Sequence, residues 1–230
     1  MEAIILAGGK AERLGDAAGG RPKALVDVAG TPLAGYQVAR LARAGVGRVI
    51  VSCAAGQGEE FERDLAGLGA EIVIAEEQER LGRGGGIKFA AQQRRESGDV
   101  YALNGDELVD VDFAALLARH DQAGGLATLT VAQPKSQFGL VDLDDGDVVH
   151  GFSEGAQVPY WVNCGNYVLT DEAIERFPDR GDHESTTFPE LASEGKLHAH
   201  RHAGLWLTVN TPKELRVATE HVEAHPEWLA

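Results

Sequence analysis

The chain has 230 residues, 43% of them hydrophobic and 25% charged, and 21 Lys and Arg against 36 Asp and Glu give a formal net charge of −15. This mix is typical of a globular chain with a sizeable core, and so large an excess of acid repels the backbone of a nucleic acid, which argues against nucleic acid as a partner. No apolar run approaches the roughly 18 residues of a membrane span, which predicts no membrane partner.

The N-terminus and the cysteines suggest the cellular compartment. Met1 and Glu2 lead directly into an apolar run instead of a charged and then apolar leader, so we expect a cytoplasmic protein. Cys53 and Cys164 each lie inside an apolar run, far apart in sequence. They are expected to be small core residues and not a disulfide.

Over the first half of the chain, short apolar runs alternate with amphipathic segments. We expect buried strands at 3–7, 48–53, 71–75 and 100–103, and helices at 33–45, 58–68, 87–95 and 113–122. Thr31 and Asp112 are the predicted N-caps of the first and the last of these helices. Strand and helix in alternation predict βαβ units and hence a three-layer α/β/α fold around a mainly parallel mixed sheet.

The second half has a different pattern. Four strand-like segments follow one another at 127–131, 139–143, 148–153 and 161–169, and a turn-forming Asp144-Asp145-Gly146-Asp147 separates the second from the third. They predict an antiparallel excursion attached to the sheet.

The end of the chain returns to the first pattern. A further strand is expected at 197–202, and Thr211-Pro212 opens a last helix that stops before Pro226. Because no linker or repeat interrupts the chain, we expect one domain over 1–230.

A glycine-rich loop follows the first strand. It reads LAGGKAERLG over 6–15 and lies at the carboxyl end of that strand, where open α/β sheets bind ligands. Glycines let backbone N–H groups approach an anion, and Arg13 suits a bidentate grip on phosphate oxygens. Lys23 follows beside Pro22. The loop matches neither G-x-G-x-x-G nor the Walker A motif, and the alternative is a flexible turn with solvated charges.

Eight segments in this order and spacing resemble the nucleotidyltransferases that condense a nucleoside triphosphate with a sugar 1-phosphate. The similarity extends over nearly the whole chain and is greatest to the mannose-1-phosphate guanylyltransferases and their glucose-, heptose-, thymidylyl- and uridylyl-specific relatives. The segments are LAGGKAERLG (6–15), RPKALVDVAGTPL (21–33), LGRGGG (81–86), NGD (104–106), FGLV (138–141), FSE (152–154), VNCG (162–165) and WLTVNTPKEL (206–215).

The resemblance implies a Rossmann-like nucleotidyltransferase fold, with a nucleotide-binding half over 1–125 and an acceptor-binding half over 126–230. It implies a Mg²⁺ cofactor held by Asp106 and Asn210, and catalytic roles for Arg13, Lys23 and Asp106. The implied nucleotide-binding residues are Leu6, Ala7, Gly8, Gly9, Gln78, Gly84, Gly85 and Asn104. The implied acceptor-binding residues are Gly139, Glu154 and Asn163.

Three positions depart from the family pattern. Ala11 and Glu12 stand where most members have Gly and Ser or Thr, which looks more like the molybdenum-cofactor guanylyltransferases. Gly155 replaces a lysine that contacts the sugar phosphate. Thr208 replaces the second metal-binding aspartate, and Asn210, two residues later on the same strand face, is its predicted substitute.

The function implied by the resemblance is Mg²⁺-dependent transfer of a nucleotidyl group from a triphosphate, with GTP favoured, to a mannose- or heptose-like sugar 1-phosphate, with release of pyrophosphate. One alternative is a cofactor-phosphate guanylyltransferase, against which the FGLV and VNCG segments argue. Another is a catalytically weakened regulatory protein that binds nucleotide sugars, suggested by Thr208 and Gly155. The sequence does not fix the base, the acceptor or the oligomeric state, and it leaves a homodimer open.

Overall fold

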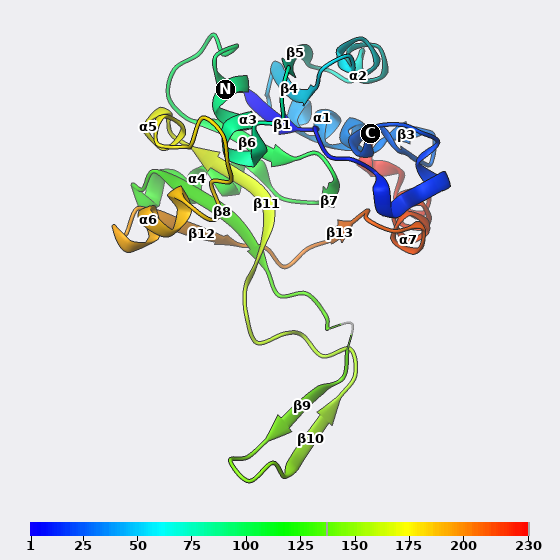
Figure 1. Cartoon of the computed structure of the whole chain (residues 1–230), viewed down its shortest axis with the longest axis vertical. Coiled ribbons are helices and arrows are strands. Elements are labelled where there is room, and N and C mark those ends of the chain that lie inside the picture. The colour runs from blue at the N-terminus through cyan, green and yellow to red at the C-terminus, as the bar shows by residue number, and fades with distance from the viewer. Residues whose placement is uncertain (137, 230) are drawn as a thin grey trace.

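A seven-stranded mixed sheet forms the centre of the computed structural model, which describes residues 1–136 and 138–229 (Figure 1). The strand order is β12-β8-β11-β6-β1-β4-β5, and β11 runs antiparallel to both of its neighbours while every other pair is parallel. The strands are β1 (Ala3–Leu6), β4 (Arg48–Ala54), β5 (Glu71–Glu77), β6 (Val100–Asn104), β8 (Ala127–Ala132), β11 (Val162–Leu169) and β12 (Leu197–Arg201).

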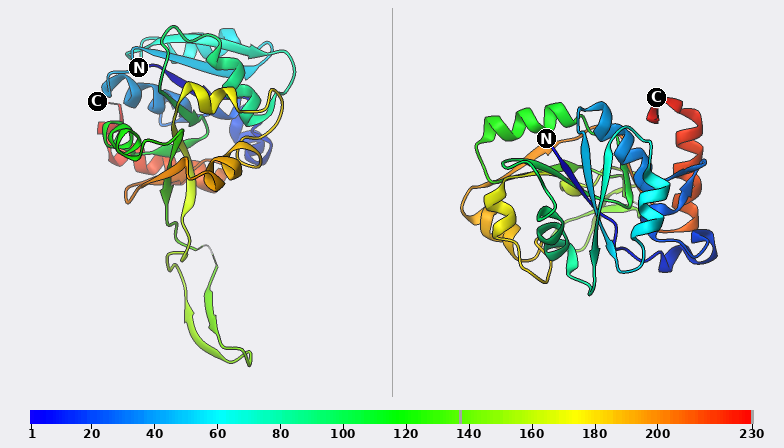
Figure 2. Two further views of the ribbon diagram at one scale, coloured as in Figure 1. Left: turned by 90° about the vertical axis from the view of Figure 1, so that its left-hand side faces the viewer. Right: turned by 90° about the horizontal axis from the view of Figure 1, so that it is seen from above.

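Helices cover both faces of this sheet (Figure 2). On one face α1 (Leu33–Arg43), α2 (Gly58–Leu65) and α4 (Phe113–Ala123) bury residues such as Leu41, Phe61 and Leu116 in a common core. On the other face α3 (Gly82–Ala91), α5 (Asp171–Glu175) and α6 (Thr187–Ser193) bury Ile87 and Leu191 in a second core. The expected three-layer α/β/α fold is therefore confirmed.

A third apolar cluster joins the two ends of the chain. The last long helix, α7 (Pro212–Ala224), packs Ala218 and Val222 against Leu14 and Val26 from the segment that follows β1. The remaining short elements are η1 (Glu12–Ala18), η2 (Lys23–Leu25) and η3 (Pro226–Trp228), which are 3₁₀ helices, and the strand pairs β2 (Asp27–Val28) with β3 (Thr31–Pro32) and β7 (Glu107–Val109) with β13 (Trp206–Thr208).

The expected excursion is a long hairpin. Strands β9 (Leu140–Leu143) and β10 (Val149–Ser153) pair antiparallel with each other, and the hairpin projects away from the body between β8 and β11 (Figures 1 and 2). Its antiparallel pairing is as predicted, but it forms a two-stranded sheet of its own and adds no strand to the central sheet.

The helix N-termini confirm some of the predicted capping residues and not others. Asp112 caps α4 by accepting a hydrogen bond from the Ala115 N–H, as predicted. Thr211 and Glu214 form a full capping box at the start of α7. The prediction for Thr31 is wrong: Thr31 pairs within β3, and Pro32 precedes α1 with no side-chain cap. Thr31 favours the N-cap position locally, but its backbone is held in the β2–β3 pair, so its side chain does not cap the helix.

Other helix boundaries differ from the predicted ones by a few residues. Helix α2 ends at Leu65 and not at residue 68, and α3 begins at Gly82 and not at residue 87, so the LGRGGG segment forms its first turn. The pair β7–β13 and the short helices α5 and α6 were not predicted. In the described part of the chain, no helix has the length and apolar character needed to cross a bilayer.

Candidate active site

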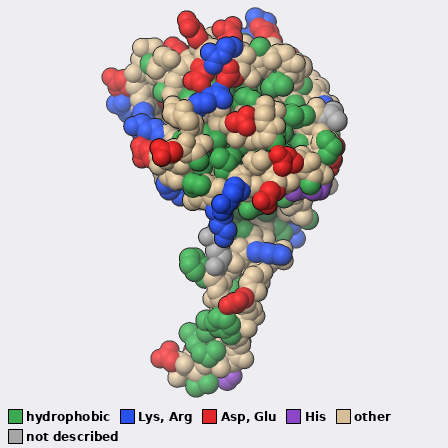
Figure 3. Space-filling view, turned by 90° about the vertical axis from the view of Figure 1, so that its right-hand side faces the viewer, with side chains coloured by type: hydrophobic (Ala, Val, Ile, Leu, Met, Phe, Trp, Pro, Cys, Tyr) green, Lys and Arg blue, Asp and Glu red, His purple; other side chains and the backbone are tan. Residues whose placement is uncertain are grey.

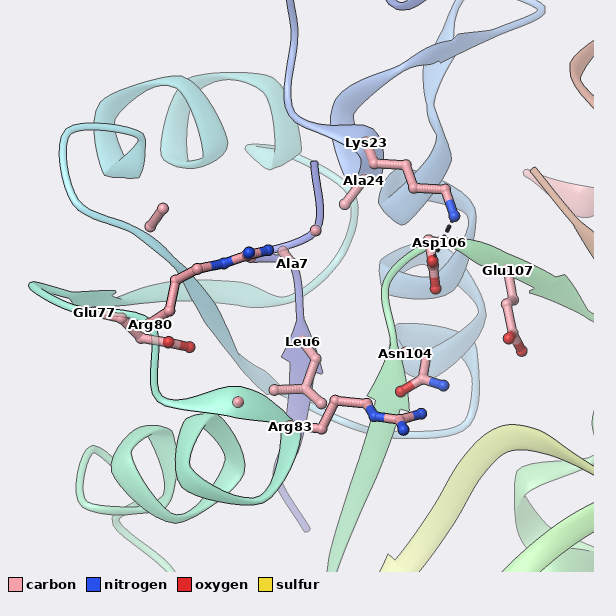
Figure 4. Close-up of a pocket in the computed structure, with 14 residues that line it drawn as sticks. Leu6, Ala7, Lys23, Ala24, Glu77, Arg80, Arg83, Asn104, Asp106 and Glu107 are labelled. Carbon is pink, nitrogen blue, oxygen red and sulfur yellow. Dashed lines mark hydrogen bonds and ion pairs between the residues drawn. The ribbon is translucent and has the colours of Figure 1, made fainter. Parts of the chain in front are cut away.

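A cavity of about 500 Å³ opens at the carboxyl ends of β1, β4, β5 and β6 (Figure 4). This is the edge at which parallel sheets bind ligands, and the volume lies within the range of small-molecule sites. Its lining residues are Leu6, Ala7, Gly8, Gly9, Lys23, Ala24, Ala54, Glu77, Arg80, Gly82, Arg83, Asn104, Asp106 and Glu107. Seven of the predicted site residues are among them: Leu6, Ala7, Gly8, Gly9, Lys23, Asn104 and Asp106.

Lys23 and Asp106 meet on one side of the cavity. The Lys23 ammonium donates to Asp106 Oδ2 at 2.6 Å (Figure 4). Its side chain is only 8% exposed, whereas that of Asp106 is 38% exposed and faces the cavity. The Lys23 N–H also donates to the Gly9 carbonyl, which holds η2 against the glycine loop. A buried cation thus faces a carboxylate at the point where β1 and β6 end.

Arg13 and Asn210 complete this cluster. Asn210 Oδ1 accepts from Lys23 Nζ at 2.6 Å and from Arg13 Nη2 at 2.8 Å. The capping box fixes Asn210 in place, because Glu214 Oε2 accepts from the backbone N–H groups of both Asn210 and Thr211. The structure therefore brings Arg13, Lys23, Asp106 and Asn210 together from four separate segments.

Only some of the oxygen-bearing side chains in this cluster are suitable ligands for magnesium. Mg²⁺ prefers hard oxygen ligands and commonly takes one or two from carboxylates and the rest from phosphates and water. Asp106 offers such an oxygen, and Glu107 places a second carboxylate beside it in the cavity lining. Asn210 Oδ1 is already engaged by two cations, so metal binding there needs one of them to move. Among the residues described, no set of three or more His, Cys, Asp and Glu is arranged around a metal position.

Glu107 is a buried carboxyl group in an unusual position. Strand β7 sets it opposite Thr208 of β13, the position at which the family aspartate is missing, so the two side chains share a face. Trp206 Nε1 donates to Glu107 Oε2 at 3.1 Å. Burial first, and then the negative charge of Asp106, raise the pKa of Glu107 to about 7.

This carboxyl group predicts a pH dependence of stability. The folded protein holds the Glu107 proton up to about pH 7, whereas the unfolded chain releases it near its ordinary pKa of 4.5. Relative to Glu107→Gln, the free energy of unfolding of the wild type should therefore fall as the pH rises from about 4.5 to about 7, by at most about 3 kcal/mol.

Urea unfolding of both proteins at pH 5, 6, 7 and 8 in the presence of a chelator measures this difference. Gln accepts the Trp206 hydrogen bond as Glu does, so the comparison isolates the charge. A difference between the two proteins that stays constant over this range contradicts the prediction.

The glycine loop forms an open wall of the cavity. A Cβ atom added to Gly8 or Gly9 would meet no atom within 4 Å, so this stretch of backbone faces free space. On the opposite wall Glu77 is held by Ser52 Oγ and by the Leu81 N–H, and the Arg80 side chain is exposed at the rim (Figure 4). The backbone at Gly8 and Gly9 thus leaves room for a ligand beside it.

Two of the predicted nucleotide-binding glycines lie elsewhere. Gly84 and Gly85 belong to the first turns of α3 and do not line the cavity. A Cβ atom on Gly85 would lie 2.5 Å from the Asp179 carbonyl oxygen, and one on Gly84 would lie 2.9 Å from the His183 nitrogen. Glycine is required here because the 178–183 loop packs directly on the helix. Gln78 is exposed beyond the cavity lining as well.

The predicted acceptor residue Asn163 reaches the cavity through a network. Its amide donates to Glu184 Oε1 at 3.0 Å and to the Tyr167 hydroxyl at 2.8 Å. Glu184 Oε2 lies 2.7 Å from an Arg83 nitrogen, and Asp182 binds the same guanidinium. Arg83 lines the cavity, so this network holds a cation on the wall opposite Lys23.

Asn104 is positioned by close contact with β11. Gly165 has a φ of +64° in the left-handed region, and a Cβ atom there would collide with the Asn104 side chain. A glycine is therefore needed for β11 to pass beside the end of β6. This contact places the 163–165 turn against the cavity lining.

Gly139 and Glu154 are not brought to the cavity. Both lie on the projecting hairpin: Gly139, which is partly buried, just before β9, and Glu154, which is exposed, just after β10. Gly139 and Glu154 therefore lie outside the cavity lining, and their role in acceptor binding stays a prediction.

Sequence reasoning did not single out Arg80, Arg83 and Glu184. Arg80 and Arg83 flank Leu81-Gly82 at the start of the LGRGGG segment. Because the sequence already assigned residues of this segment to nucleotide binding, both arginines could have been predicted as site residues from their position. Glu184 gave no such signal, because only the folded chain places it between Asn163 and Arg83.

The family described as Nucleotidyl transferase matches residues 2–225. The chain belongs to this family. It is 30% identical over 244 aligned positions to the mannose-1-phosphate guanylyltransferase catalytic subunit beta of Xenopus tropicalis, and the match covers the whole chain and 68% of that protein. It is 32% identical to the mannose-1-phosphate guanylyltransferase of Mycobacterium tuberculosis, over 93% of this chain and 62% of the other. The chain thus spans about two thirds of the length of these relatives.

Solved structures agree with this assignment. HddC from Yersinia pseudotuberculosis superposes with a TM-score of 0.75 and 25% identity, covering 96% of this chain and 98% of that one. A second HddC structure, complexed with GMP-PN, has a TM-score of 0.73 at 24% identity over the same shares. The expected class, a nucleotidyltransferase related to the sugar-1-phosphate guanylyltransferases, is confirmed.

Proposed function

We propose that this nucleotidyltransferase moves a guanylyl group from GTP to a mannose- or heptose-like sugar 1-phosphate, with Mg²⁺, and releases pyrophosphate. The preference for GTP is supported by the names of the relatives and by the guanine nucleotide analogue in the HddC complex. A reaction that consumes a nucleoside triphosphate suits the cytoplasm, which we propose as its location.

One observation carries the proposal: Arg13, Lys23, Asp106 and Asn210 converge beside a glycine loop. Lys23 and Asp106 of this cluster line the cavity of about 500 Å³, while Arg13 and Asn210 lie behind them, outside its lining. Two phosphorylated molecules must approach each other in this reaction. At 4 Å and an effective dielectric constant near 20, each pair of unit negative charges repels by about 4 kcal/mol. Catalysis must therefore come from positioning and from fixed positive charge.

The residues present can supply both. The attacking sugar phosphate oxygen is already anionic, so no general base is needed. Lys23 is buried beside Asp106 and would neutralise charge shared between the acceptor phosphate and the α-phosphate. Arg13 would bind the β- and γ-phosphates, and the backbone amides of Gly8 and Gly9 would bind phosphate oxygens, since the Ala7 N–H donates to the Ser52 carbonyl. Arg83, fixed by Glu184, adds positive charge on the opposite wall.

Asp106 would hold the magnesium ion, with Glu107 beside it. When bound, Mg²⁺ supplies two positive charges against the developing charge on the phosphates. Asn163 and Glu184 offer amide and carboxylate oxygens for sugar hydroxyls on the side of the cavity that faces β11.

The proposal is tested by measuring pyrophosphate release from five nucleoside triphosphates (ATP, CTP, GTP, UTP and dTTP), each combined with mannose, glucose and heptose 1-phosphates and with a cofactor phosphate, in Mg²⁺ and in EDTA. We expect the fastest release for GTP with the mannose or heptose 1-phosphate, and none in EDTA. Release only with a cofactor phosphate as acceptor would identify a cofactor guanylyltransferase. Tight nucleotide binding without release for any pair would identify a binding protein.

A further inference from the structure

The hairpin between β8 and β11 stands apart from the rest of the fold, since no other described strand pairs with it. We call residues 133–136 and 138–161 the arm. Its two sides are linked near the body by a bridge between Lys135 and Gln157 and farther out by the β9–β10 ladder. Among the described strands, β9 and β10 pair only with each other. An isolated two-stranded ribbon is at best marginally stable in water, so this arm needs a further contact.

Apolar side chains are concentrated on the arm and beside it. Eleven large hydrophobic side chains are exposed in the described residues, and nine of them lie between Phe138 and Val162. Only Val217 and Leu229 lie elsewhere. Figure 3 shows hydrophobic side chains gathered along the projecting part of the molecule. The nine are Phe138, Val141, Leu143, Val148, Val149, Phe152, Tyr160, Trp161 and Val162.

Four of these residues share one face of the ribbon. Phe152 lies opposite Val141 and Val149 lies opposite Leu143 in the antiparallel register, so each pair points the same way. These side chains are 65%, 47%, 56% and 54% exposed, respectively. In a folded protein such an apolar sheet face is normally covered by a second layer.

The exposed apolar area is large for a single molecule. At roughly 150–250 Å² for an aromatic side chain, Phe138, Phe152, Tyr160 and Trp161 alone expose on the order of 500 Å². The five aliphatic residues add to this area, and four of the nine residues lie on the shared ribbon face. The largest apolar patch on a typical monomer is about 300–600 Å², whereas each partner in a standard-size interface buries about 800 Å².

We propose that the arm is a dimerisation element, and that the apolar face of one arm packs against the same face of a second copy of this chain. A two-fold axis through the middle of the face gives such a self-complementary contact. The two arms then run antiparallel, with the tip of each beside the base of the other.

Charge favours this antiparallel arrangement. Asp142, Asp144, Asp145 and Asp147 lie at or near the tip of the arm. At the base lie Lys135 and Arg201 together with one carboxylate, Glu154, and the Arg201 guanidinium stacks over the Trp161 ring at 5.0 Å. An antiparallel pair sets each acidic tip near a basic base, while a parallel pair would crowd eight aspartates together.

Light scattering coupled to size-exclusion chromatography, with analytical ultracentrifugation, tests the proposal. At micromolar concentration the wild-type chain should have twice its mass of 24.4 kDa. Phe152→Asp should weaken the dimer at least about a hundredfold, because it places a charge in the apolar contact. Val217→Asp is the matched control, since Val217 is 43% exposed on α7 and outside the arm, and it should remain dimeric.

Phe152→Asp should keep the circular dichroism spectrum of the control and a cooperative thermal transition, with a melting temperature lowered only by the loss of the dimer contact, so loss of folding is distinguishable from loss of the dimer. A wild type that stays monomeric at about 100 µM overturns the proposal. A Phe152→Asp dimer of wild-type strength overturns it as well.

Disulfide trapping tests the geometry. Both native cysteines are buried, so Val141→Cys introduces the only exposed thiol among the described residues. On mild oxidation it should form a cross-linked dimer, whereas Val217→Cys should not. Equal cross-linking of the two variants contradicts contact between the arm faces.

Discussion

Replacement of Asp106 by alanine is expected to lower kcat for pyrophosphate release by at least about a hundredfold. Asp106 is the carboxylate that faces both the cavity and the Lys23 ammonium, and it is the proposed ligand of the magnesium ion. Without Asp106 the magnesium ion loses a ligand, so the negative charge of the phosphates is less well neutralised. Lys23 also loses one of its two described acceptors and keeps Asn210. Measurement of kcat over a range of Mg²⁺ concentrations checks both consequences.

Two further variants make this result interpretable. Asp106→Asn leaves an oxygen for Lys23 but removes the charge, so it should lose activity with a smaller change in stability than the alanine variant. Asp121→Ala removes an exposed carboxylate of α4 and should behave as wild type. Activity of Asp106→Ala within a few-fold of wild type, with the fold intact, would remove Asp106 from the metal site.

Lys23→Met is expected to lower kcat and to raise the apparent KM for the sugar 1-phosphate together, with a combined loss of about a hundredfold to a thousandfold in kcat/KM. Methionine keeps the apolar stem of a side chain that is 8% exposed, but it removes the charge between Asp106 and Asn210. Steady-state kinetics with each substrate varied in turn measure the two parameters.

Lys10→Met provides the control for this variant. Lys10 belongs to the glycine loop that Lys23 contacts. Its side chain is 66% exposed and its Nζ lies 3.8 Å from Glu12 Oε1, so its replacement should change the kinetics little. If Lys23→Met changes only the affinity for the nucleotide, Lys23 acts on the triphosphate and not on the acceptor.

Much of this site follows from the sequence because the relevant residues end neighbouring strands. Leu6 and Asn104 are register partners in β1 and β6, so the residues that follow these strands must lie close together. Any parallel pairing of the two strands brings the glycine loop beside Asp106. The strands themselves are short apolar runs, which local patterns identify well.

The glycines of α3 show a limit of such reasoning. A run such as Gly84-Gly85-Gly86 indicates only that something approaches the backbone closely. In the folded chain the 178–183 loop packs on Gly84 and Gly85, and the Glu77 and Leu6 side chains pack on Gly86. A sequence read alone does not distinguish a ligand from another part of the same chain.

The hairpin shows a second limit. Its strands and its turn were predicted because they depend on alternation and on Asp-Gly chemistry, which are local. Whether a hairpin folds over its own sheet or projects from it depends on contacts with distant residues. For this reason the predicted acceptor residues Gly139 and Glu154 could be assigned to strands but not to a distance from the cavity.

The position of Asn210 also bears on protein synthesis. Its side chain bonds to Arg13 across 197 residues and to Lys23 across 187, and its backbone is held by the first turn of α7. A growing chain on the ribosome has already made its glycine loop, Lys23 and Asp106, yet the cluster around Asn210 cannot form until residues 210–214 have emerged. This part of the catalytic geometry therefore forms only after the first turn of α7 has folded against the glycine loop.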